Sequence, residues 1–146
     1  MTTRVDFAFG APHRLRTACQ VVRKHYLAGR KLIIYHSDKR ALARFDRLLW
    51  GFEPDAFIPH VSVQHPLAAQ TPILLTDTAP QPLTVNPAEP IWLLNLDNQC
   101  PSTAAQFQRI LEIVSDQEQD KQSARQRWRQ YQQWQFDVRA HQLPSR

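Results

Sequence analysis

The residues best suited to chemistry near the carboxyl end of the sequence are two cations and a tryptophan. Lys121, Arg125 and Trp128 stand at i, i+4 and i+7, so on a helix they share one face. This set suits an acidic peptide with a hydrophobic end, because the cations bind carboxylates and the ring packs on the side chain. The same set could hold single-stranded nucleic acid by base stacking and phosphate contacts. A packed amphipathic helix with a solvated basic edge is the third interpretation.

A second group is aromatic and apolar, and it falls in an expected loop. Trp50, Phe52, Phe57 and Ile58 lie in a segment interrupted by glycine and proline. Loops usually run over the surface, so these side chains are hard to bury together. Exposed apolar patches often mark protein interfaces, in which tryptophan frequently contributes much of the binding energy. The alternative is that the loop folds back over the sheet and completes the core.

The sequence carries no pattern that requires an enzyme. The six histidines show no HxH, HxxxH or Cys-His spacing, so no metal site is expected. Cys19 and Cys100 lie outside any CxxC motif and are expected to be reduced thiols, with Cys19 in the core. The first turn has one glycine, Gly10, and Pro12 removes a backbone donor, so a dinucleotide site is not expected. No catalytic residue and no cofactor are therefore predicted.

Strand and helix patterns alternate along the chain and must position these groups. Short apolar runs predict strands at 5–9, 31–35, 72–76 and 91–96, of which 31–35 is typical of a strand buried on both faces. Stripes at helical spacing predict helices after Pro12, after Ser37 or Asp38, and from about 115 to 134. A further helix is expected from Ser102 or Thr103, because four apolar side chains then align: Ala104, Phe107, Leu111 and Val114.

This order of elements predicts an α/β fold class. Alternating strands and helices favour right-handed crossovers and a parallel sheet. We expect a single three-layer domain over residues 1–146, with a mostly parallel central sheet and a nucleotide-binding-like topology without a nucleotide site.

Composition and charge exclude several classes of protein. With 42% hydrophobic residues among 146, the chain fits one folded domain and not a disordered polymer. It has no apolar run of about 18 residues and no visible secretory signal, so a cytoplasmic protein without a membrane partner is expected. The formal charge is +5, with +6 in residues 1–60. That charge permits an acidic partner without choosing between nucleic acid and peptide.

Five stretches together resemble the chi subunit of bacterial DNA polymerase III. They are RVDFAF at 4–9, AGRK at 28–31, DRLLW at 46–50, AFIPH at 56–60 and KQSARQRWRQY at 121–131. The resemblance runs over nearly the whole chain, and its most specific part is Leu-Trp followed by Phe-Ile-Pro-His. It implies a non-catalytic accessory subunit of the clamp-loader assembly, inside a bacterial DNA-directed DNA polymerase.

The resemblance also implies partners and the residues that bind them. Chi proteins pair with the psi subunit, which ties them to the clamp loader, and the matching residues here are Trp50, Phe57 and Ile58. Chi proteins also hold the acidic C-terminal tail of single-stranded DNA-binding protein, and the matching residues here are Val114, Lys121, Arg125 and Trp128. The family often has tyrosine where Trp128 stands, so the aromatic wall is kept without the hydroxyl.

Two other uses remain open at this point. The psi-binding face could serve instead as an adaptor for a repair helicase. The chain could also be a direct single-stranded nucleic-acid-binding module, whereas the family implies that DNA contact is mostly indirect.

Overall fold

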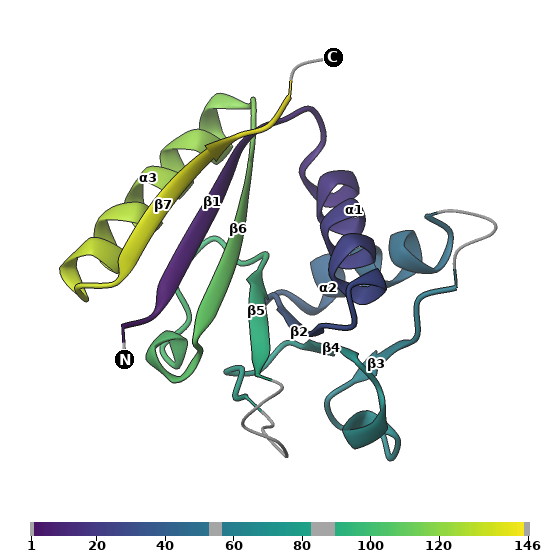
Figure 1. Cartoon of the computed structure of the whole chain (residues 1–146). Coiled ribbons are helices and arrows are strands. Elements are labelled where there is room, and N and C mark those ends of the chain that lie inside the picture. Colours follow the sequence, from purple (N-terminus) through teal and green to yellow (C-terminus); the bar gives the residue numbers. More distant parts are fainter. Residues whose placement is uncertain (1, 53–56, 83–89, 145–146) are drawn as a thin grey trace.

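A seven-stranded sheet forms the centre of the computed structural model, which describes residues 2–52, 57–82 and 90–144 (Figure 1). Residues 53–56 of the expected aromatic loop lie outside the described residues. The strands are β1 (Arg4–Ala11), β2 (Lys31–Tyr35), β3 (His60–Ser62), β4 (Ile73–Thr76), β5 (Ile91–Asn95), β6 (Arg109–Ser115) and β7 (Asp137–Gln142). The α-helices are α1 (Arg14–Leu27), α2 (Lys39–Trp50) and α3 (Glu118–Gln133). The strand order is β3-β4-β2-β5-β6-β1-β7, and the described pairings are all parallel.

Helices cover both faces of this sheet. Helices α1 and α2 lie on one face and α3 lies on the other (Figure 1). Ile33 and Ile34, neighbours in β2, belong to opposite core clusters, because successive side chains of a strand point to opposite faces. Ile34 packs in the cluster of Phe45 from α2, and Ile33 in the cluster of Tyr131 from α3. The predicted three-layer α/β arrangement with a mostly parallel sheet is confirmed.

The helix ends follow the local chemistry of the sequence. Asp38 caps α2, where its Oδ1 accepts a hydrogen bond from the backbone N–H of Arg40 at 2.9 Å. Helix α1 stops just before Gly29, whose φ of +77° lies in the left-handed region that glycine adopts without strain. Helix α3 begins at Glu118, slightly later than expected.

The helix expected from Ser102 or Thr103 is wrong. A short 3-10 turn, Ala104–Gln106, is followed there by strand β6, which lies between β5 and β1. Leu111 and Val114 stand at helical spacing from Ala104 and Phe107 only by chance. They belong to a strand whose apolar residues are buried on both faces of the sheet. Such two-sided burial and β-branched content are typical of a central parallel strand.

Two edge strands have no counterpart in the sequence-based expectation. Strand β7, with the sequence DVRAHQ, pairs in parallel with β1 and is exposed along most of its length. Strand β3 has three residues and pairs with β4 at the opposite edge. Edge strands need no apolar alternation, so hydrophobic patterning does not reveal them.

His25 of α1 is buried near the amino-terminal end of β5. The ring of His25 meets the ring of Trp92 edge-on, with 5.5 Å between the ring centroids. Burial, with the positive charges of Arg30, Arg109 and Lys24, lowers the pKa of His25 to about 4. His25 is therefore neutral at physiological pH in the folded chain.

This depressed pKa makes the stability of the fold pH-dependent. In the unfolded chain His25 titrates near pH 6.5, so the unfolded state takes up the proton first as the pH falls. The contribution of neutral His25 to the free energy of unfolding is fully present above about pH 6.5. It is lost progressively as the pH falls from about 6.5 to about 4. Over that window the wild type is expected to lose roughly 3 kcal/mol more unfolding free energy than His25→Gln, which cannot titrate. Urea unfolding at pH 7, 5.5 and 4 measures the difference, and parallel pH profiles would contradict the assignment.

Candidate functional site

Two aromatic side chains meet on the surface beside α2. Trp50, the last residue of α2, is 49% exposed, and Phe57 is 69% exposed. Their ring centroids lie 5.5 Å apart. We refer to Trp50 and Phe57 as the aromatic patch. Most large apolar side chains are buried, so two exposed ones in contact favour a protein-binding surface.

The other apolar residues of the same segment are not on the surface. Ile58 is 3% exposed and belongs to the core cluster of α1 and α2, where it anchors the segment that presents Phe57. Phe52 is half-buried against that cluster, and the guanidinium of Arg16 lies 5.7 Å from its ring centroid. Both expectations for this segment thus hold in part: it covers the core and also exposes an aromatic pair.

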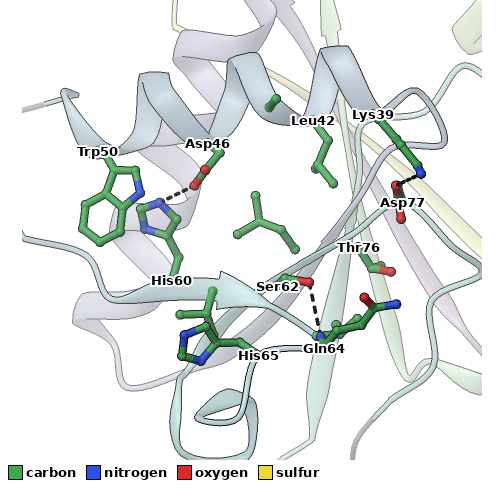
Figure 2. A pocket seen from close by; sticks show the side chains of 14 residues that line it. Lys39, Leu42, Asp46, Trp50, His60, Ser62, Gln64, His65, Thr76 and Asp77 are labelled. Carbon is green, nitrogen blue, oxygen red and sulfur yellow. Dashed lines mark hydrogen bonds and ion pairs between the residues drawn. The ribbon is translucent and has the colours of Figure 1, made fainter.

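A buried histidine, which the sequence-based reasoning did not select, supports the patch. The ring centroids of His60 and Trp50 lie 4.1 Å apart. His60 Nδ1 lies 2.7 Å from the Ile58 carbonyl oxygen, to which it must donate because a carbonyl only accepts. Nε2 lies 2.9 Å from the Asp46 carboxylate (Figure 2). The imidazole therefore packs against the tryptophan ring and bonds to the backbone next to Phe57.

A pocket of about 400 Å³ continues from the patch between α2 and β3 (Figure 2). Its apolar lining includes Leu42, Val61 and Leu75. Charged groups also line it: Asp46 lies toward Trp50, and Lys39 Nζ lies 3.9 Å from Asp77 Oδ2 at the other end (Figure 2). The lining therefore mixes apolar side chains with polar and charged ones, directly beside the exposed aromatic patch.

Helix α3 brings the predicted cations and tryptophan together on the other side of the sheet. Arg125 is 57% exposed, and among the described residues its one ion pair is with the exposed Glu118, at 3.4 Å. Lys121 is half-buried. Trp128 is half-buried too, and its ring centroid lies 5.1 Å from that of Phe7 and 6.2 Å from that of Phe9. The ring thus packs on the sheet and keeps an exposed part beside the helix cations. We refer to Lys121, Arg125 and Trp128 as the α3 surface.

Val114, the fourth residue matched to tail binding, lies in the interior. It is on β6, is fully buried and belongs to the core cluster against which Trp128 packs. Val114 therefore lies beneath the α3 surface, in the core on which Trp128 packs, and is not itself exposed.

A buried polar network joins α3 to the sheet. Glu112 on β6 accepts hydrogen bonds from the Arg127 guanidinium at 3.0 Å, the Asn95 amide at 2.8 Å and the Tyr131 hydroxyl at 2.7 Å. All four side chains belong to buried residues. Burial, followed by the charge of Glu112, raises the pKa of Tyr131 well above its ordinary value. A glutamate inside an apolar run, ILEIV, was the signal in the sequence that could have located this network.

The ends of the strands where doubly wound folds bind nucleotides are occupied by an arginine. Arg14, at the start of α1, donates to the Ile113 carbonyl at 2.9 Å and to the Leu96 carbonyl at 3.0 Å. These carbonyls lie at the carboxyl ends of β6 and β5, the usual position of a ligand in such sheets. The Arg14 side chain thus fills this position and hydrogen-bonds to the strand carbonyls there.

The described part of the chain shows no cluster of metal-binding side chains and no activated thiol. Across residues 2–52, 57–82 and 90–144, no three His, Cys, Asp or Glu side chains come together as metal ligands. Cys19 and Cys100 are free thiols, and burial raises the pKa of each to about 12, which keeps both protonated at neutral pH. The described helices also include none with the length and apolar content needed to cross a bilayer.

The chain is thus an open-sheet α/β protein with helices on both faces, and the aromatic patch and the α3 surface differ in chemistry. The family model of the DNA polymerase III chi subunit, HolC, matches residues 1–139. The chain belongs to this family, as its resemblance predicted, and is a chi-type subunit of the polymerase III replication complex.

Two curated relatives carry the same name. DNA polymerase III subunit chi of Pseudomonas aeruginosa is 28% identical over 151 residues, which cover 97% of this chain and 98% of the relative. DNA polymerase III subunit chi of Haemophilus influenzae is 25% identical over 113 residues, which cover 77% of this chain and 76% of the relative. The similarity to the first therefore extends over the full fold.

Proposed function

We propose that this chain is a non-catalytic bridge, which binds the psi subunit on one side and the acidic tail of single-stranded DNA-binding protein on the other. The observation that carries the proposal is the placement of the aromatic patch and the α3 surface. The patch belongs to the α2 side of the sheet and the α3 surface to the opposite side (Figure 1). Two partners can therefore be bound at once without competing for the same residues. The bridge would work in the bacterial cytoplasm, where it would link coated lagging-strand DNA to the clamp loader.

The aromatic patch has the chemistry of the psi-binding side. Trp50 and Phe57 offer exposed apolar area next to a pocket that can receive a partner's side chain. Aromatic side chains beside a pocket are typical of the few residues that carry most of the binding energy of an interface. Ile58 contributes from the core, by holding the backbone that presents Phe57.

The α3 surface has the chemistry of the tail-binding side. Arg125 is largely exposed, so it is available for a carboxylate at the cost of one weak surface ion pair. The half-buried Trp128 ring provides an apolar wall for the hydrophobic end of the tail. A contact of this size is expected to have micromolar affinity, roughly −8 kcal/mol, which permits repeated release during lagging-strand synthesis.

Titration with a short acidic peptide that ends in Pro-Phe tests the tail site. Arg125→Ala and Lys121→Ala are each expected to weaken binding by roughly tenfold, because each removes a charge-assisted contact. Wild-type binding should also weaken with added salt, since exposed charges are screened over about 8 Å at physiological ionic strength. The matched control is Arg40→Ala, which removes an exposed arginine of α2 on the other side of the sheet. Unchanged binding of the peptide by both α3 variants would contradict the proposed tail-binding site.

A further inference from the structure

Cationic side chains gather at the amino-terminal edge of the sheet, on the face that α1 covers. Arg109 begins β6 and Arg4 begins β1, and the two stand opposite each other in neighbouring strands. Both side chains lie on the α1 face, since Leu111, two residues after Arg109, belongs to the core cluster of α1 and α2. Lys24 and Arg30, near the end of α1, add two exposed cations beside them. We refer to these four residues as the cationic edge.

A tryptophan holds two of these cations in place. The guanidinium carbons of Arg30 and Arg109 lie over the Trp92 ring, at 4.6 Å and 4.4 Å from its centroid. Such stacking restricts the arginine side chains while their N–H groups can still donate. Less conformational entropy is then lost when these donors bind an anion.

In the described part of the chain, the carboxylates of Asp6 and of Asp137, which stands opposite Arg4 on β7, balance part of the charge of the four cations. The buried carboxylate of Asp6 is shared by Arg4 at 3.0 Å, Arg109 at 2.7 Å and His141 at 2.7 Å. Burial works to raise the pKa of Asp6, but hydrogen bonds from these three side chains lower it overall. The depressed pKa of His25 arises from burial and, next, from the cations of this edge. Both effects indicate a positive potential at this edge.

We infer that the cationic edge binds the phosphate backbone of single-stranded DNA. A cluster of cations suits the closely spaced phosphates of a nucleic-acid strand, and arginine can bind phosphate through two parallel hydrogen bonds. The Trp92 ring is covered by its two arginines, so the contact is made to the backbone and not by base stacking. An acidic peptide with a hydrophobic end fits less well, because this ring does not offer the apolar wall that Trp128 offers on α3. The sequence had suggested nucleic-acid binding from the charge of +6 in residues 1–60 and from the cations and tryptophan of α3. The geometry favours the first of these, on the opposite face of the sheet from α3, beyond the end of α1.

Binding of a fluorescent 20-nucleotide oligo(dT) to the full chain tests this inference by anisotropy. The wild type is expected to bind at 50 mM salt with a steep loss of affinity as salt rises. Lys24→Gln combined with Arg30→Gln should weaken binding roughly tenfold and lower the salt slope by about 1.4, since two phosphate contacts are lost. Both residues are exposed, so folding should be unaffected.

The matched control is Arg40→Gln combined with Arg44→Gln, which removes the same charge from exposed positions of α2. It is expected to bind like the wild type, as is Arg125→Ala on α3. Absence of wild-type binding at 20 mM salt, or equal weakening by both double variants, would overturn the inference. So would stronger competition by poly-glutamate than by unlabelled oligo(dT). As a second readout, the pKa of His25 should rise from about 4 on adding oligo(dT), in NMR titrations of its ring, and an unchanged value would contradict binding at this edge.

Discussion

Glu112→Ala is expected to lower the free energy of unfolding by about 3–5 kcal/mol, the largest single effect on stability that we expect in this chain. Glu112 accepts from Arg127, Asn95 and Tyr131 in the interior. Its removal leaves the guanidinium of Arg127, which is only 1% exposed, without its carboxylate. An uncompensated buried charge costs far more than the pair contributes when it is intact. Urea unfolding followed by circular dichroism measures the change.

Two further variants separate this effect from the general loss of a carboxylate. Glu118→Ala removes an exposed carboxylate of α3, 67% exposed, and should change stability by less than about 0.5 kcal/mol. Combining Glu112→Leu with Arg127→Met removes the unpaired charge and should recover part of the loss, because the buried donors of Asn95 and Tyr131 still lose their acceptor. A loss below about 1 kcal/mol for Glu112→Ala would show that the network is not an important stabilising element.

Phe57→Ala is expected to abolish co-purification with psi, with at least a hundredfold loss of affinity. Phe57 is the most exposed of the large apolar side chains in the described residues, and its ring contacts that of Trp50 at a tilted angle. Truncating an aromatic residue at the centre of an interface typically costs more than 2 kcal/mol of binding. Stability should hardly change, because the side chain packs little of its surface in the free chain. Pull-down of purified psi by the tagged chain measures the loss.

The matched control for this prediction is Leu27→Ala. Leu27 is 65% exposed at the end of α1, so its truncation removes a comparable exposed apolar side chain away from the patch. It should leave psi binding intact. Equal losses for Phe57→Ala and Leu27→Ala would mean that the patch has no special role. A helicase that used the same patch would compete with psi, and it would lose binding with the same Phe57→Ala change.

How well the fold could be predicted depended on burial. The run at 31–35 is apolar throughout because β2 lies in the middle of the sheet, so the sequence alone identified it. Strand β6 is equally central, but Glu112 interrupts its apolar run, and helical spacing with upstream residues misled the prediction. Only the three-dimensional pairing of Glu112 with Arg127, from α3, explains why a charge can lie there. Strand β7 is exposed at an edge and left no apolar pattern to recognise.

The sequence predicted which residue types make up the candidate surfaces, but not which of their side chains are buried. Helical spacing correctly brought Lys121, Arg125 and Trp128 onto α3. Residue type and spacing could not separate Phe57, which is exposed, from Ile58 and Val114, which are buried, although the resemblance assigned all three to binding surfaces. His60 supports Trp50 through a contact between α2 and β3, ten residues apart, which no local pattern encodes.

The central claim, two independent binding sides, is tested most directly by assembling three components. Sedimentation velocity of the chain with psi and a labelled acidic tail peptide is expected to show all three in one complex. Phe57→Ala should then retain the peptide and lose psi, whereas Arg125→Ala should retain psi and bind the peptide at least roughly tenfold more weakly. If either variant loses both partners while remaining folded, or if psi displaces the peptide from the wild type, the two-sided bridge is contradicted.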